Sequence, residues 1–327
     1  MRRFLTTLLV AVAALLAAEG LARALPPSTL HCSLTDRNPA VRYGWPGWTA
    51  PRDRPAGQRL VVVLSNSQGF APELEDPSLT WPSRLRRRLL EGGDAAVYNW
   101  SLNAARGPEL AVLAAQAGRH EPDLVLVVAG SGTFSQAQAT WRVGFRANDL
   151  RDLLADPAAA RRLPEPLIAG LRAQVGLRWT DHVRARSGLV RLRDRLPLLE
   201  KGIAQVAQET PEDGGGSGGA GGNTLGAHRG EGAGDALLDA LRQAAGAPVL
   251  FVGQPLGPGA SEADRAARRA FVERTAARWQ PDAGASIVDA ADAVTPERFL
   301  SLTHLDARGH ADFAAWLGPR VDDALTR

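Results

Sequence analysis

VVVLSNSQGF, at residues 61–70, joins four apolar residues to a polar turn. Three of the four apolar residues are β-branched, which predicts a short buried strand. The Ser, Asn and Gly residues that follow are ordinary turn residues. In an open α/β sheet, ligands bind outside the carboxyl ends of the strands. Ser67 is therefore a candidate for chemistry at this edge, although a plain strand-to-loop turn has the same composition.

Short apolar runs alternate with helical patterns along most of the remaining chain. Strands are predicted at 96–99, 124–129, 248–253 and 286–289, and helices at 78–90, 108–118, 235–244, 262–279 and 311–325. This alternation predicts an α/β fold with a parallel sheet. It is interrupted by an arginine-rich helical pattern, which we interpret as an insertion at 148–210, and by a glycine-rich flexible loop at 211–234.

The composition argues against several classes of function. The formal net charge is only +3, and the arginines are scattered without the interleaved aromatic residues typical of nucleic-acid binding. Cys32 is the only cysteine, so neither an internal disulfide nor a cysteine metal cluster is expected. The histidines lack metal-ligand spacing, and the glycine-rich loop lacks the spacing of a phosphate-binding motif. We therefore expect no metal and no cofactor.

The first 25 residues form a signal anchor or a signal peptide. Arg2 and Arg3 precede an apolar run from residue 4 to residue 18, and the run continues past Glu19 to residue 25. Counting through Glu19 gives the length of a spanning helix, and the arginines predict a cytoplasmic amino terminus. We expect a membrane-anchored domain on the external side, or a secreted one if the segment is cleaved. Residues 26–58 are predicted to be an extended lead-in to a domain at 59–327.

A second informative stretch is SLTHLDARGH at residues 301–310. His304 lies in a predicted loop between a late strand and the final helix, where it can meet a serine that follows the first strand. His310 is expected to begin the helix and to lie on the surface. Ser67 and His304 are therefore the candidate nucleophile and base.

These stretches resemble the sequence blocks of the SGNH (GDSL-type) hydrolases. Residues 65–67 stand where that family has Gly-Asp-Ser, and THLDARGHADFA is similar to the block that carries the family's catalytic histidine. VYNWSLNAARG resembles the second block, with Asn99 at the conserved asparagine and Ala104 at the position of an oxyanion-binding glycine. The resemblance covers residues 59–129 and 247–327.

The resemblance implies a flavodoxin-like three-layer sandwich with a mostly parallel five-stranded sheet, here carrying the helical insertion. It also implies that Ser67 is the nucleophile and His304 the general base. The backbone N–H groups of Ser67 and Ala104 are the implied oxyanion hole, and Asn103 is a further candidate donor.

The chain departs from the family pattern at two places. The third block falls on residues 130–133, GSGT, which lack the asparagine amide that donates to the oxyanion; Asn103, Ser131 and Thr133 are alternative donors. The aspartate three residues before the histidine is replaced by Ser301, which is a candidate for orienting His304. Asp289, Asp292 and Glu297 are the alternatives for that role.

Two functions are compatible with this pattern. The first is a serine esterase or O-acyltransferase that acts on ester-linked acyl groups of exported polysaccharide, a substrate suggested because the anchor resembles that of SGNH proteins working on such glycans. The second is a catalytically degenerate SGNH domain that binds glycan or protein partners in an envelope assembly. The two departures favour the second function, and the Ser67 and His304 pair favours the first.

Overall fold

The structure is a computed structural model that describes residues 2–24, 57–71, 73–92, 95–101, 105–134, 160–175, 231–279 and 284–327, together with Leu154, Trp179 and Ser187. The predicted lead-in and glycine-rich loop lie almost wholly outside these ranges, as does most of the predicted insertion. Within the insertion the structure describes helix α8, Glu165–Val175.

Five parallel strands form the central sheet in the order β2-β1-β3-β4-β5. Their bounds are β1 Arg59–Ser65, β2 Ala95–Asn99, β3 Leu124–Ala129, β4 Val249–Gly253 and β5 Ala285–Asp289. The predicted strands agree with these bounds to within two residues. This strand order is the flavodoxin-like order of doubly wound sheets, so the predicted α/β fold class is confirmed.

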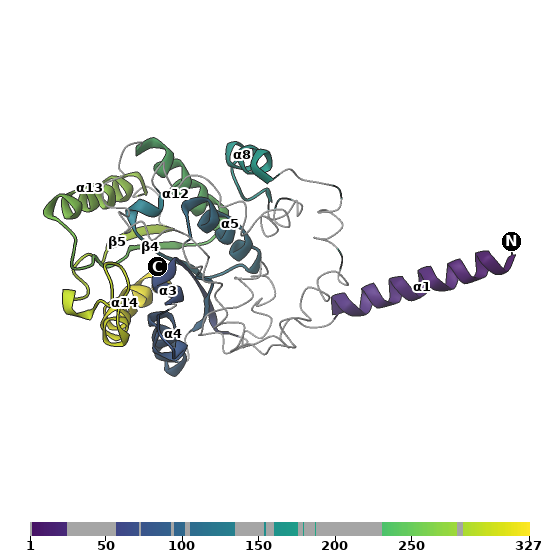
Figure 1. Cartoon of the computed structure of the whole chain (residues 1–327), viewed down its shortest axis with the longest axis horizontal. Helices are drawn as coiled ribbons and strands as arrows, with labels where there is room; N and C mark the ends of the chain where they lie inside the picture. The colour runs from purple at the N-terminus through teal and green to yellow at the C-terminus, as the bar shows by residue number, and fades with distance from the viewer. Residues whose placement is uncertain are drawn as a thin grey trace.

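Helices cover both faces of the sheet (Figure 1). Leu60, Val62 and Leu64 of β1 pack toward α5 (Gly107–Ala117), α12 (Glu231–Ala245) and α13 (Glu262–Trp279). Val61 and Val63 pack toward α4 (Trp81–Glu91) and α14 (Ala307–Thr326) on the other face. Because side chains alternate between the two faces of a strand, a strand that is apolar throughout needs helices on both sides.

Side chains that cap the helices account for several of their boundaries. Thr80 Oγ1 accepts from Ser83 N at the start of α4, and Pro82 occupies the first turn, where its missing N–H is harmless. Asp306 Oδ1 accepts from Gly309 N, so α14 begins at Ala307, before the predicted residue 311. Likewise, α12 begins at Glu231 instead of residue 235, inside the predicted loop.

The amino-terminal helix α1 spans Arg2–Ala24 and is drawn outside the α/β body in Figure 1. Its segment Phe4–Ala22 is long and apolar enough to cross a membrane, and within it only Ala22, at the end, is buried. A signal peptide has the same length and composition, so α1 is compatible with either a membrane anchor or a cleaved signal.

Trp81 tests the packing between α4, α14 and the sheet. Its side chain is fully buried, and its ring meets that of Phe313 in α14 edge-on with the ring centroids 5.4 Å apart. We predict that Trp81→Ala lowers the free energy of unfolding by roughly 3–5 kcal/mol, because it leaves a large cavity between the helices. Trp179 is 74% exposed, and Trp179→Ala is the matched control. A loss of stability below about 1 kcal/mol for Trp81→Ala, as seen in denaturant titration, would contradict this packing.

Candidate active site

The turn after β1 is fixed by hydrogen bonds on both of its sides. Ser65 Oγ donates to Val128 O in β3 at 2.7 Å, and Asn66 Oδ1 accepts from Gln68 N at 3.0 Å. Asn66 thereby caps the short helix α3, Ser67–Phe70. Ser67 is the first residue of that helix, so its N–H cannot be satisfied within the helix.

The end of β2 contributes a second set of contacts to this turn. Asn99 Nδ2 donates to Gly69 O at 3.1 Å, and Asn99 Oδ1 accepts from Ser101. A Cβ at Gly69 would lie 2.2 Å from Ser101 Oγ, so only glycine permits this close approach. Asn99 thus holds α3 against the end of β2.

The structure brings Ser67 and His304 together, with 2.8 Å between Ser67 Oγ and His304 Nε2. The loop that carries His304 is also tied to the serine turn through Gln68, whose Nε2 donates to Thr303 O at 2.6 Å. Gln68 is almost completely buried. Two adjacent residues of α3 therefore hold two adjacent residues of the histidine loop.

Glu73 occupies the other side of the imidazole, with 2.6 Å between Glu73 Oε1 and His304 Nδ1. The chain between Ser67 and Glu73 passes through Ala71, which has a left-handed backbone with φ 46° and ψ 66°. Non-glycine residues adopt this conformation at a cost of about 1 kcal/mol or more. Ala71 thus lies between the two residues, Ser67 and Glu73, whose side chains contact the same imidazole.

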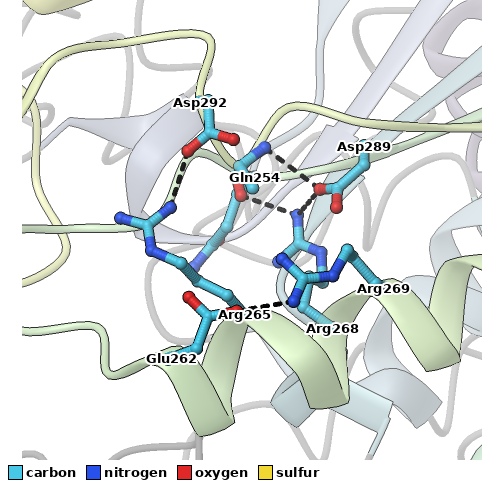
Figure 2. Close-up of polar contacts among 8 residues, drawn as sticks. Gln254, Glu262, Arg265, Arg268, Arg269, Asp289 and Asp292 are labelled. Atoms are coloured by element: carbon cyan, nitrogen blue, oxygen red, sulfur yellow. Dashed lines mark hydrogen bonds and ion pairs between the residues drawn. The ribbon is translucent and has the colours of Figure 1, made fainter.

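The acidic group beside His304 corrects the sequence-based assignments. Ser301 Oγ accepts from the backbone N–H of His304 at 3.2 Å, so it supports the loop and does not orient the ring. Figure 2 shows that Asp289 pairs with Arg268 and Asp292 with Arg265. These two carboxylates are engaged with arginines of α13, whereas Glu73 pairs with the imidazole. Glu73 was missed because the candidates were sought close to His304 in the sequence, whereas Glu73 lies far from it, shortly after Ser67.

His310 is also placed differently from the prediction. Its side chain is buried, and Nδ1 accepts from the backbone N–H of Trp81 at 3.1 Å, at the start of α4. Burial, reinforced by the positive charge of Arg84, lowers the pKa of His310 to about 4. The imidazole is therefore neutral at pH 7 and serves as a hydrogen-bond acceptor that joins α4 to α14.

Of the expected oxyanion donors, Ala104 and Asn103 lie outside the described residues. Ser131 and Thr133 belong to the 3₁₀ turn Ser131–Phe134 after β3, and Thr133 is buried. The described groups, Ser67, His304 and Glu73, form a hydroxyl–imidazole–carboxylate series. Such a series can remove the proton from a serine hydroxyl and stabilise the imidazolium that results.

No protein-family model matches the chain, and no curated protein matches it. Among solved structures, the chain is similar to TesA, with 15% identity, a TM-score of 0.41, and coverage of 81% of this chain and 99% of that one. It is also similar to a carbohydrate esterase family 3 protein from Talaromyces cellulolyticus, at 11% identity and a TM-score of 0.37, covering 82% and 99% of the two chains. A carbohydrate esterase family 2 enzyme from Corynascus thermopiles matches at 12% identity and a TM-score of 0.40, covering 84% and 68%. These likenesses are too distant to assign the chain to a family.

The contact between Glu73 and His304 predicts the reactivity of Ser67. Glu73→Gln keeps the volume of the side chain but cannot stabilise an imidazolium, so Ser67 should react with a fluorophosphonate between about 10 and 10⁴ times more slowly. Glu75→Gln, two residues away and exposed, should react like the wild type. Ser301→Asp should not increase the rate of labelling, because Glu73 already contacts Nδ1 of His304. An unchanged rate for Glu73→Gln would show that the carboxylate does not serve the imidazole.

The buried neutral state of His310 predicts how stability depends on pH. The folded pKa of about 4 lies below the ordinary 6.5, so the unfolded chain binds the proton more tightly. The stabilisation is present above pH 6.5 and is lost as the pH falls toward 4, by about 3 kcal/mol in all. His310→Asn retains an acceptor for Trp81 N and cannot titrate in this range. The free energies of unfolding of the wild type and His310→Asn, measured by denaturant titration, should therefore converge as the pH falls from 6.5 toward 4. A difference that stays constant with pH would contradict the assignment.

Proposed function

We propose that the protein is a serine esterase or O-acyltransferase that acts on ester-linked acyl groups. The observation that carries the proposal is the alignment of Ser67 Oγ, 2.8 Å from His304 Nε2, and of Glu73 Oε1, 2.6 Å from His304 Nδ1. Each ring nitrogen faces the group that acyl transfer requires of it. The site lies at the carboxyl ends of parallel strands, where α/β sheets bind ligands.

In the proposed mechanism, Ser67 Oγ attacks the acyl carbonyl carbon while His304 Nε2 accepts the hydroxyl proton. Glu73 holds the proton on Nδ1 and stabilises the imidazolium, and the N–H of Ser67 is a donor to the oxyanion. Collapse of the tetrahedral intermediate breaks the ester C–O bond, and His304 gives its proton to the leaving alcohol. The acyl group now esterifies Ser67.

The second half of the reaction repeats these steps with a new nucleophile. Water or an acceptor hydroxyl attacks the acyl-serine, His304 takes the proton from it, and the proton returns to Ser67 Oγ as the acyl group leaves. Water gives hydrolysis and another hydroxyl gives acyl transfer. Both outcomes use the same three residues.

The amino-terminal helix supports a proposal for location and substrate. Arg2 and Arg3 precede an apolar segment that is long enough to cross a membrane, which is the arrangement of an anchor with a cytoplasmic amino terminus. The catalytic domain then faces the outside. Acylated exported polysaccharide is the proposed substrate class because such a domain meets it at the membrane surface.

The second candidate function is a domain that binds glycan or partner proteins without catalysis. It is favoured by Gly132, which has no side chain at the position where the family resemblance places an oxyanion-binding amide. The engagement of His304 by Glu73 argues for the catalytic function, because a carboxylate beside Nδ1 is the group that stabilises the imidazolium formed during acyl transfer.

Turnover of a small aryl acetate by the purified full-length protein in detergent decides between these functions. We predict measurable turnover for the wild type and loss of it to the uncatalysed rate in Ser67→Ala and in His304→Ala. His120→Ala is the control, because His120 packs edge-on against Trp100 and lies outside the triad. Turnover that survives Ser67→Ala would refute the catalytic proposal, and an inert wild type would leave the binding function in its place.

A further inference from the structure

Gln254 directly follows β4 and lies beside the first residue of the turn after β3. Ala129 pairs with Gly253 in the sheet, and Gln254 N donates to Ala129 O at 3.2 Å, so Gly130 and Gln254 leave the sheet side by side. A Cβ at Gly130 would lie 3.1 Å from Gln254 Nε2. The side-chain amide of Gln254 therefore lies beside Gly130, two residues before Gly132, which lacks the expected amide.

The orientation of the Gln254 amide follows from a chain of hydrogen bonds that begins at a backbone N–H. Gln68 N can only donate, so the atom of Asn66 that faces it at 3.0 Å is the oxygen Oδ1. The other end of the Asn66 amide is then the nitrogen, and it donates to Gln254 at 2.9 Å, so that this atom of Gln254 is Oε1. Nε2 of Gln254 faces away from Asn66, and it donates to no residue that the structure describes.

Gln254 is also held firmly through its backbone. Arg268 Nη2 donates to Gln254 O at 2.7 Å and pairs with Asp289 Oδ1 at 3.1 Å, as Figure 2 shows. Arg268 is only 2% exposed, and a Cβ at Gly253 would lie 2.1 Å from Arg268 Nη2, so the glycine makes room for the guanidinium. A buried ion pair thus fixes the residue that presents the amide.

We infer that Gln254 Nε2 is the side-chain donor to the carbonyl oxygen of the acyl group, in place of the amide that residues 130–133 lack. This inference depends on the proposed acyl-transfer function. A preorganised amide next to the residue that precedes the nucleophile costs no reorganisation when negative charge develops on the oxygen. Gln254 is then a catalytic residue, and Asn66 and Arg268 are positioning residues that orient it.

The experiment separates the role of Gln254 Nε2 from the contact between Gln254 Oε1 and Asn66. Gln254→Glu keeps an oxygen that can accept from Asn66 Nδ2 and replaces the nitrogen Nε2 with a second oxygen. Gln254→Ala removes both. If the amide binds the oxyanion, both variants should lower kcat for an aryl acetate by about 10²–10³ with little change in KM. Gln243→Ala, an exposed glutamine of α12, should match the wild type.

Asn66→Asp provides a second test. A carboxylate at residue 66 cannot donate, so the Gln254 amide must turn its nitrogen toward that side chain and can no longer offer Nε2 to the substrate. We expect a fall in kcat comparable to that of Gln254→Glu, with the melting temperatures of all variants measured as a check on folding.

Normal turnover in Gln254→Glu together with a loss in Gln254→Ala would overturn the inference, because it would reduce Gln254 to a support for Asn66. Normal turnover in both would overturn it as well. A wild type that is inert and unlabelled at Ser67 would instead refute the proposed function itself, so the two failures are distinguishable.

Discussion

The imidazole of His304 is contacted at both of its nitrogens by one short segment, residues 67–73, and the candidate site depends on these two contacts. Ser67 and Glu73 contact the two nitrogens, and Gln68 binds the backbone next to the histidine. All three side chains belong to the chain that leaves β1. Because β1 lies inside the sheet between β2 and β3, this segment is anchored by a strand that is buried at every residue after Arg59. The precision of the site therefore derives from the sheet.

The fold was predictable because its signals are local. Apolar runs such as residues 124–129 are long enough for a strand and too short for a helix, and Thr80, a typical capping residue, directly precedes α4. Ser67 was identified from its place at the end of such a strand, and His304 from its place before the final helix. Parallel strands bring these two loops to the same edge, which accounts for their 2.8 Å contact.

Glu73 and Gln254 could not be identified in the same way. Glu73 lies in a polar turn with Glu75 and Asp76, and nothing in that composition distinguishes one carboxylate from the others. The segment that carries it passes through the left-handed backbone of Ala71, a residue with no sequence signature for positive φ. Gln254 acquires its orientation through Asn66, which is distant in sequence. His310 was misassigned for a related reason, since its burial depends on the packing of α4 against α14.

Some of the titratable groups around the site stabilise the fold, and others belong to the candidate site. Asp289 is paired with the buried Arg268, and Asp306 caps α14, so both carboxylates stabilise the fold. His310 is kept neutral by burial and connects two helices. Glu73 alone among these residues pairs with the ring that contacts Ser67.

A double-mutant cycle between Glu73 and His304 most directly tests whether Glu73 acts through the imidazole. The quantity to measure is the rate constant for fluorophosphonate labelling of Ser67 in the wild type, Glu73→Gln, His304→Ala and the double variant. If Glu73 acts through the imidazole, Glu73→Gln slows labelling when His304 is present and has no effect when His304 is replaced by alanine. An equal loss in both backgrounds would show that Glu73 and His304 act independently and would contradict the triad.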